Sequence, residues 1–144
     1  MWEKWVQLAS LGAITCLMRG AIGEIVAAPG GADLSLKVLD ESAAVATACG
    51  HKPSEAFLSR NAGVMTELGS PLTSSMYRDL CKGAPVEVDH ILGDFIERGD
   101  AHGVASPLLK AAFVNLRVYQ ATLPRDGAGP LPRLALDRRV APRE

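Results

Sequence analysis

Two groups of polar side chains in this sequence have types and spacings that could do chemistry. Glu87, His90 and Asp94 follow one another at intervals of three and four residues, so on a helix they would share one face and could hold a metal ion. A di-metal carboxylate site needs this motif on two helices. The sequence has one copy, which favours a solvated acidic face without a metal. Ser74 and Ser75 could supply a nucleophile, but serines at the start of a helix are more often caps or anion-binding hydroxyls.

Lys4 is a further candidate, because it lies at the start of a long apolar segment. Residues 5–18 read WVQLASLGAITCLM. This run is shorter than the ~20 apolar residues of a membrane-spanning helix, and Glu3 sits where a signal peptide would carry positive charge. We therefore predict a buried helix. Lys4 is then either a terminal lysine that extends into water or a functional group.

The composition excludes several classes of protein. The 144 residues suffice for one domain, and 48% hydrophobic with 22% charged residues is an ordinary globular balance. A net charge of -1 is less basic than a nucleic-acid binder would carry. The three cysteines include no CxxC pair, which argues against a disulfide framework and favours a reducing compartment. We therefore predict a cytoplasmic protein without nucleic-acid or membrane partners.

We expect a folded domain over 1–120 and a disordered tail over 121–144. The tail holds four of the nine prolines, together with Gly127 and Gly129, a composition typical of loose segments. Neither segment contains a GxGxxG or GxxxxGK[ST] motif, so residues that would bind a nucleotide cofactor are unknown from the sequence.

Within 1–120 the apolar residues recur at helical spacing and show no alternating strand pattern. The predicted helices cover about 2–19, 33–49, a short stretch after Pro53, a stretch from Pro71 to near Gly83, 85–99, and a last helix that begins with a Ser106 cap and Pro107. Residues 23–31 are expected to form a loop. The predicted fold class is all-α, a compact bundle of about six helices.

Several motifs occur in order along 1–120. The sequence opens with WEKW at 2–5, continues with IGEI at 22–25, and has AHGVASPLL at 101–109. Between them comes Ser-Ser-Met-x-x-Asp followed by Glu-x-Asp-x-x-x-Gly, formed by Ser74, Ser75, Met76, Asp79, Glu87, Asp89 and Gly93. Together these motifs resemble the C-terminal domain of the ketopantoate reductase (2-dehydropantoate 2-reductase) family. That domain is helical and is similar to the 6-phosphogluconate dehydrogenase C-terminal domain.

The resemblance implies a reaction and three site residues. The family transfers a hydride from NADPH to the ketone of 2-dehydropantoate, which gives pantoate for the pantothenate pathway. Lys4 matches the family's general acid, and Glu87 matches the glutamate that bonds the substrate hydroxyl and helps to hold the lysine. Ser75 matches the serine that binds the substrate carboxylate. We expect Lys4, Ser75 and Glu87 to meet in one open cleft.

Two departures from the family pattern leave alternatives open. Family asparagines one and two turns after the lysine are replaced by Leu8 and Gly12, which predicts a changed choice of substrate. The family's Rossmann domain has no counterpart in this sequence, so the chain alone is expected to be inactive. It is either the substrate-binding and catalytic-acid half of a reductase, with a separate Rossmann domain or a second copy as partner, or a non-enzymatic helical dimerisation module. An unrelated helical adaptor is the third possibility.

Overall fold

The computed structural model describes residues 1–124, and the predicted all-α fold is confirmed there. In order along the chain, the helices are α1 (Trp2–Met18), α2 (Ile22–Ala27), α3 (Gly31–Ala48), α4 (Glu55–Val64), α5 (Ser75–Cys81), the π-helical segment η1 (Asp89–Gly93), α6 (Asp94–Ala101) and α7 (Pro107–Thr122). The predicted tail lies outside the described residues from 125 onward. No helix in residues 1–124 is long and apolar enough to cross a membrane.

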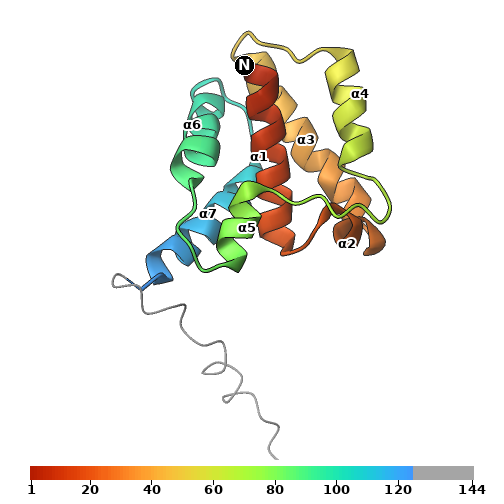
Figure 1. Ribbon diagram of the computed structural model, residues 1–144. Coiled ribbons are helices and arrows are strands. Elements are labelled where there is room, and N and C mark those ends of the chain that lie inside the picture. Colours follow the sequence, from red (N-terminus) through yellow and green to blue (C-terminus); the bar gives the residue numbers. More distant parts are fainter. Residues whose placement is uncertain (125–144) are drawn as a thin grey trace, which may run out of the picture.

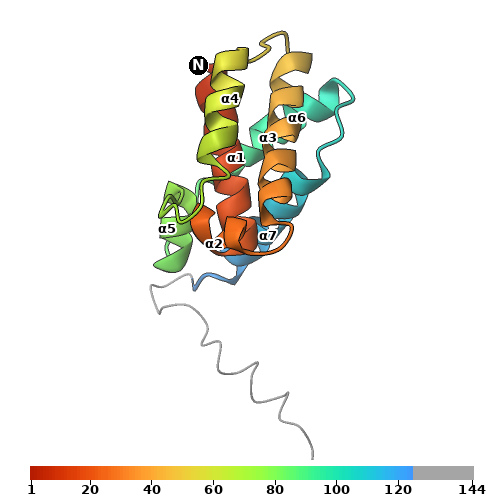
Figure 2. The same ribbon diagram turned by 90° about the vertical axis from the view of Figure 1, so that its right-hand side faces the viewer.

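The first helix is the centre of the bundle. Figure 1 shows α3, α5, α6 and α7 arranged around α1, and Figure 2 shows α4 beside α1 and α3. Most of α1 is buried, as its apolar sequence predicts. The terminal methyl group of Met76 on α5 fills the space that a Cβ atom on Gly12 would occupy, so α5 packs closely on α1 at this position.

The predicted loop at 23–31 is wrong for its first half, which forms α2. The Glu24 carboxylate accepts a hydrogen bond from the Ala21 backbone N–H at 3.0 Å, and this capping interaction supports the short helix. On its other side, α2 is tied to the chain before α5. The backbone N–H groups of Ile22 and Gly23 donate to the carbonyls of Leu72 and Ser70 at 2.9 and 2.8 Å.

These last bonds explain a second correction. The fourth predicted helix begins at Ser75 and not at Pro71, because the carbonyls of Ser70 and Leu72 bind α2 and are not available for a helix of their own. The helix predicted over 85–99 begins at Asp89 with η1 and continues to Ala101 in α6. With α2 added, the described chain has seven α-helices, one more than the sequence indicates.

The predicted start of α7 is confirmed, but the predicted cap by Ser106 is wrong. Ser106 precedes Pro107 as predicted, yet its hydroxyl makes no capping bond and is buried without a partner among the described residues. The Glu41 carboxylate of α3 caps the helix instead, since it accepts hydrogen bonds from the backbone N–H groups of Leu108 and Leu109, both at 3.0 Å. A carboxylate at this end also interacts favourably with the helix dipole. This contact joins α3 to α7.

Candidate functional site

Lys4 lies on the first turn of α1 with its side chain exposed to solvent. It forms no salt bridge with a described residue. Leu8 follows one helical turn later on the same face, and 40% of it is exposed. Buried residues of α1 cover its other sides, so this face is where the central helix of the bundle meets solvent.

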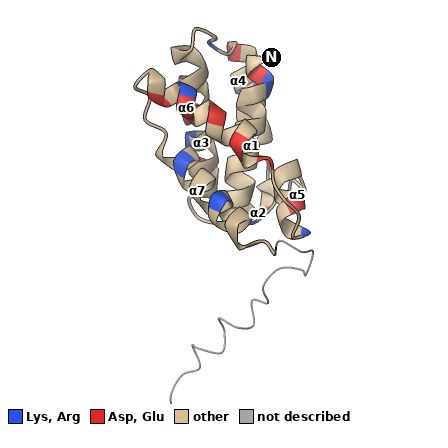
Figure 3. Cartoon of the chain, turned by 90° about the vertical axis from the view of Figure 1, so that its left-hand side faces the viewer, with Lys and Arg blue, Asp and Glu red and all other residues tan. Residues whose placement is uncertain are grey.

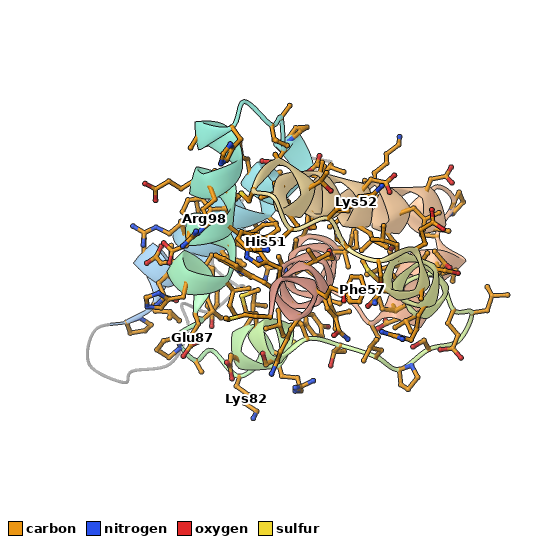
Figure 4. All side chains as sticks on the ribbon, turned by 90° about the horizontal axis from the view of Figure 1, so that it is seen from above. His51, Lys52, Phe57, Lys82, Glu87 and Arg98 are labelled. Carbon is orange, nitrogen blue, oxygen red and sulfur yellow. The ribbon has the colours of Figure 1, made fainter. Side chains whose placement is uncertain are left out.

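Glu87 lies just before η1, next to the buried Val88, and its own side chain is exposed. Its segment is tied to α1, because the Trp5 indole N–H donates to the Ile91 carbonyl at 3.0 Å and the Ile91 N–H donates to the Glu87 carbonyl at 3.3 Å. Figure 4 looks down α1 and shows Glu87 between α5 and α6. A π-helical turn of this kind is frequent at functional sites.

Ser75 is the first residue of α5, and its side chain is exposed. The capping role belongs to the buried Ser74, whose hydroxyl accepts the Tyr77 N–H at 3.0 Å and shares a hydrogen bond of 2.7 Å with the Thr15 hydroxyl. Ser75 is therefore left facing outward. Since Thr15 is eleven residues after Lys4, α5 begins about 16 Å further along α1 at a rise of ~1.5 Å per residue.

No hydrogen bond or salt bridge joins Lys4, Ser75 and Glu87 within residues 1–124, so their convergence in one cleft stays a prediction. On the predicted acidic face, His90 and Asp94 form an exposed pair with Nδ1 and the carboxylate 3.7 Å apart. Figure 3 shows both acidic and basic residues on α6 and basic residues on α7. Two ion pairs join α7 to its neighbours: Lys110 with Asp100 at 2.8 Å and Arg117 with Asp89 at 3.1 Å.

Sequence reasoning missed an aromatic cluster beside the first turn of α1. Trp2 stacks on His51 with ring centroids 4.8 Å apart, and Trp5 packs against Phe95 at 5.2 Å. The Arg98 guanidinium lies 5.8 Å from the Trp2 ring and 5.3 Å from the Trp5 ring, which is cation–π distance. Figure 4 shows His51 and Arg98 on this side of the molecule. The two tryptophans in WEKW were the available signal, but their partners are far away in sequence.

A pocket of about 410 Å³ lies at the opposite end of α1, between its last turn, α2 and the start of α3. Met18, Arg19, Glu24, Ile25 and Leu34 are among its lining residues. None of the three predicted site residues lines it. The predicted site residues therefore lie outside this pocket.

Two side chains near the start of α5, Cys16 and Tyr77, have raised pKa values. Burial raises the pKa of the Cys16 thiol to about 11, although a hydrogen bond with Ser74 opposes this shift. Cys16 is fully buried in α1, so it is a protonated packing group at neutral pH. A hydrogen bond with Cys81 raises the pKa of the half-buried Tyr77 phenol above its ordinary value.

Two helix N-termini of the described chain are occupied by side chains of the protein. Pyrophosphate is usually held by free backbone N–H groups at a helix N-terminus after a glycine-rich turn. Here Ser74 occupies the N-terminus of α5 and Glu41 that of α7, and a carboxylate at the latter position would repel phosphate. No cofactor site is shown in residues 1–124.

Comparison with known proteins agrees with the helical fold and with the order of the motifs. The sequence profile described as "Ketopantoate reductase PanE/ApbA C terminal" matches residues 1–120. The chain belongs to this family, and its fold is of the 6-phosphogluconate dehydrogenase C-terminal-like type. The 2-dehydropantoate 2-reductase of Pyrobaculum aerophilum is 35% identical over 112 residues, which cover 78% of this chain and 40% of that protein.

Solved structures agree on the fold. A dimeric ketopantoate reductase from Staphylococcus aureus superposes with a TM-score of 0.74 at 26% identity, over 85% of this chain and 43% of that one. D-Mandelate dehydrogenase, whose structure contains NADH and anilino(oxo)acetate, superposes with a TM-score of 0.69 at 18% identity, over 85% of this chain and 40% of that one. The chain spans about 40% of the length of the curated relatives that it matches.

Proposed function

We propose that this chain is the substrate-binding and catalytic-acid domain of an NADPH-dependent reductase of the 2-dehydropantoate 2-reductase type. The observation that carries the proposal is that Lys4, Ser75 and Glu87 have no role in the fold. All three side chains are exposed, while their neighbours Trp5, Ser74 and Val88 are held by hydrogen bonds or burial. Reactive side chains without a structural role, on the matching positions of the family motif, favour a function.

The proposed roles follow from the chemistry of each group. NADPH, when bound to a separate nucleotide-binding domain, supplies the hydride. The Lys4 ammonium donates a proton to the carbonyl oxygen of the 2-oxo acid and so neutralises the alkoxide that develops there. The Glu87 carboxylate accepts hydrogen bonds from the substrate and from Lys4. The Ser75 hydroxyl donates a hydrogen bond to the substrate carboxylate.

The proposal is tested by supplying the nucleotide-binding domain. The full chain is fused behind that domain of the Pyrobaculum aerophilum reductase, and NADPH oxidation is followed with 2-dehydropantoate. We expect turnover by the fusion, and a loss of at least about 100-fold in kcat for Lys4→Ala, the usual scale for a lost general acid. Lys37→Ala is the matched control, because Lys37 is an exposed lysine on α3. Equal activity of the two variants would remove Lys4 from the mechanism.

A second candidate is a non-enzymatic dimerisation module. The observation that favours it is the outer face of α7, where Val114 and Val118 are 57% and 58% exposed, and a relative is described as dimeric. Sedimentation of the full chain measures whether it forms a dimer, and the activity of the fusion then decides between the two candidate functions. A dimer that Val118→Lys dissociates, together with an inactive fusion, would favour the module over the enzyme.

A further inference from the structure

The first turn of α1 is fixed to the rest of the bundle by both sequence neighbours of Lys4. On one side, the Trp5 indole N–H donates to the Ile91 carbonyl in η1 at 3.0 Å. On the other side, the Glu3 carboxylate accepts hydrogen bonds from the hydroxyl and the backbone N–H of Ser54 at 3.2 and 3.4 Å. The Lys4 side chain itself is exposed. The backbone from which Lys4 extends is therefore held in place by its two neighbours.

The Trp5 bond leads directly to the segment that carries Glu87. Ile91 accepts the indole proton through its carbonyl, and its own backbone N–H donates to the Glu87 carbonyl at 3.3 Å. Two hydrogen bonds thus connect the residue beside Lys4 with the Glu87 backbone, although 86 positions separate Trp5 from Ile91. The indole bond therefore fixes where the turn with Lys4 lies relative to Glu87.

The Trp5 ring is held as firmly as its N–H group. It packs against Phe95 with ring centroids 5.2 Å apart, and the Arg98 guanidinium lies 5.3 Å from its centroid, which is cation–π distance. Phe95 and Arg98 both belong to α6, which continues directly from η1. All three contacts of Trp5 are thus made with one continuous segment, and together they orient the indole N–H toward Ile91.

We infer that Trp5 is a positioning residue for the proposed reaction, and that its indole N–H holds Lys4 and Glu87 at the separation that proton donation requires. The inference rests on the proposed function, because it concerns the same two residues. A general acid must lie within hydrogen-bond reach of the atom that it protonates. A displacement of about 1 Å can cost about 100-fold in rate, even when its cause is far from the chemistry.

The test compares the two tryptophans of the aromatic cluster in the fusion described above. Trp5→Phe keeps an aromatic ring and removes the N–H donor, and we expect kcat to fall by about 10- to 100-fold. KM should change little, since Ser75, the proposed carboxylate ligand, lies on α5 and is untouched. Trp2→Phe is the matched control. Trp2 lies 5.1 Å from Trp5 and 5.8 Å from Arg98, but its indole donates no hydrogen bond within residues 1–124, so we expect this variant to keep the parental kcat.

A double-variant cycle tests whether Trp5 acts through Lys4. If it does, Trp5→Phe has little further effect on kcat in a Lys4→Ala background, because the group that it positions is already absent. A loss of stability alone would lower kcat by a similar factor in both backgrounds.

NMR of the unaltered chain tests the hydrogen bond without an activity assay. The chain has two tryptophans, both half-buried, so their indole N–H protons form a matched pair. We expect the Trp5 proton to exchange with solvent more slowly than the Trp2 proton, because only the Trp5 proton is bonded within the described fold.

The outcomes separate this inference from the proposed function. Lys4-dependent turnover with equal kcat for Trp5→Phe and the parent, or with equal losses for Trp5→Phe and Trp2→Phe, would overturn the inference and leave the function standing. The same conclusion would follow if Trp5→Phe lowered kcat equally with and without Lys4, or if the two indole protons exchanged at the same rate. A fusion without Lys4-dependent turnover would overturn both the function and the inference.

Discussion

At the scale of single residues, the buried thiol of Cys16 makes stability depend on pH in the alkaline range. Its pKa is about 11 in the folded chain against an ordinary value of 9.0. Between these values the unfolded chain loses a proton that the folded chain keeps, so the free energy of unfolding falls as pH rises. By pH ~11 we expect a loss of about 2 kcal/mol from this group.

Urea titrations at pH 8 to 11 measure this loss, with Cys16→Ala as the control that removes the titrating group. The difference in unfolding free energy between the two proteins should shrink as pH rises, whatever tyrosines and lysines contribute to both. A difference that stays constant over this range would show that Cys16 ionises equally in the folded and unfolded chain.

At the scale of elements, the structure assigns the start of α7 to Glu41 and not to Ser106. Glu41→Ala leaves the backbone N–H groups of Leu108 and Leu109 without their acceptor, and we expect it to lower the free energy of unfolding by about 1 to 2 kcal/mol. Ser106→Ala removes a buried hydroxyl that has no partner among the described residues, so it should cost less than about 0.5 kcal/mol. Chemical denaturation of both variants compares the two residues. If Ser106→Ala were the more damaging, Ser106 would be the cap.

At the scale of the whole molecule, the chain corresponds to less than half of its curated relatives. We expect calorimetry to find no micromolar affinity of the separate chain for NADPH, because the described residues contain no strand–GxGxxG–helix unit to hold the pyrophosphate. The fusion with a nucleotide-binding domain is the positive control. Micromolar binding by the separate chain would mean that a phosphate site exists on this domain after all.

The sequence predicted the helical class, because the apolar spacing along α1, α3 and α7 depends only on local periodicity. It also predicted the family, through motifs such as the one that contains Ser74 and Glu87. It did not predict α2 or the late start of α5. Both depend on hydrogen bonds between Ile22 or Gly23 and residues about fifty positions away, and local patterns carry no information about such partners.

For the candidate site, the sequence alone determined which residue types are present: a lysine, a serine and a glutamate on family positions, with a leucine one turn after the lysine. Only the tertiary structure decided which polar side chains are bound within the fold and which stay exposed. Ser74 became the cap bound to Thr15 while Ser75 stayed exposed, and Trp5 was bound to Ile91 while Lys4 beside it remained in solvent. The physical reason is that burial and hydrogen-bond partners are set by segments that meet across the bundle, so two adjacent residues can receive opposite roles.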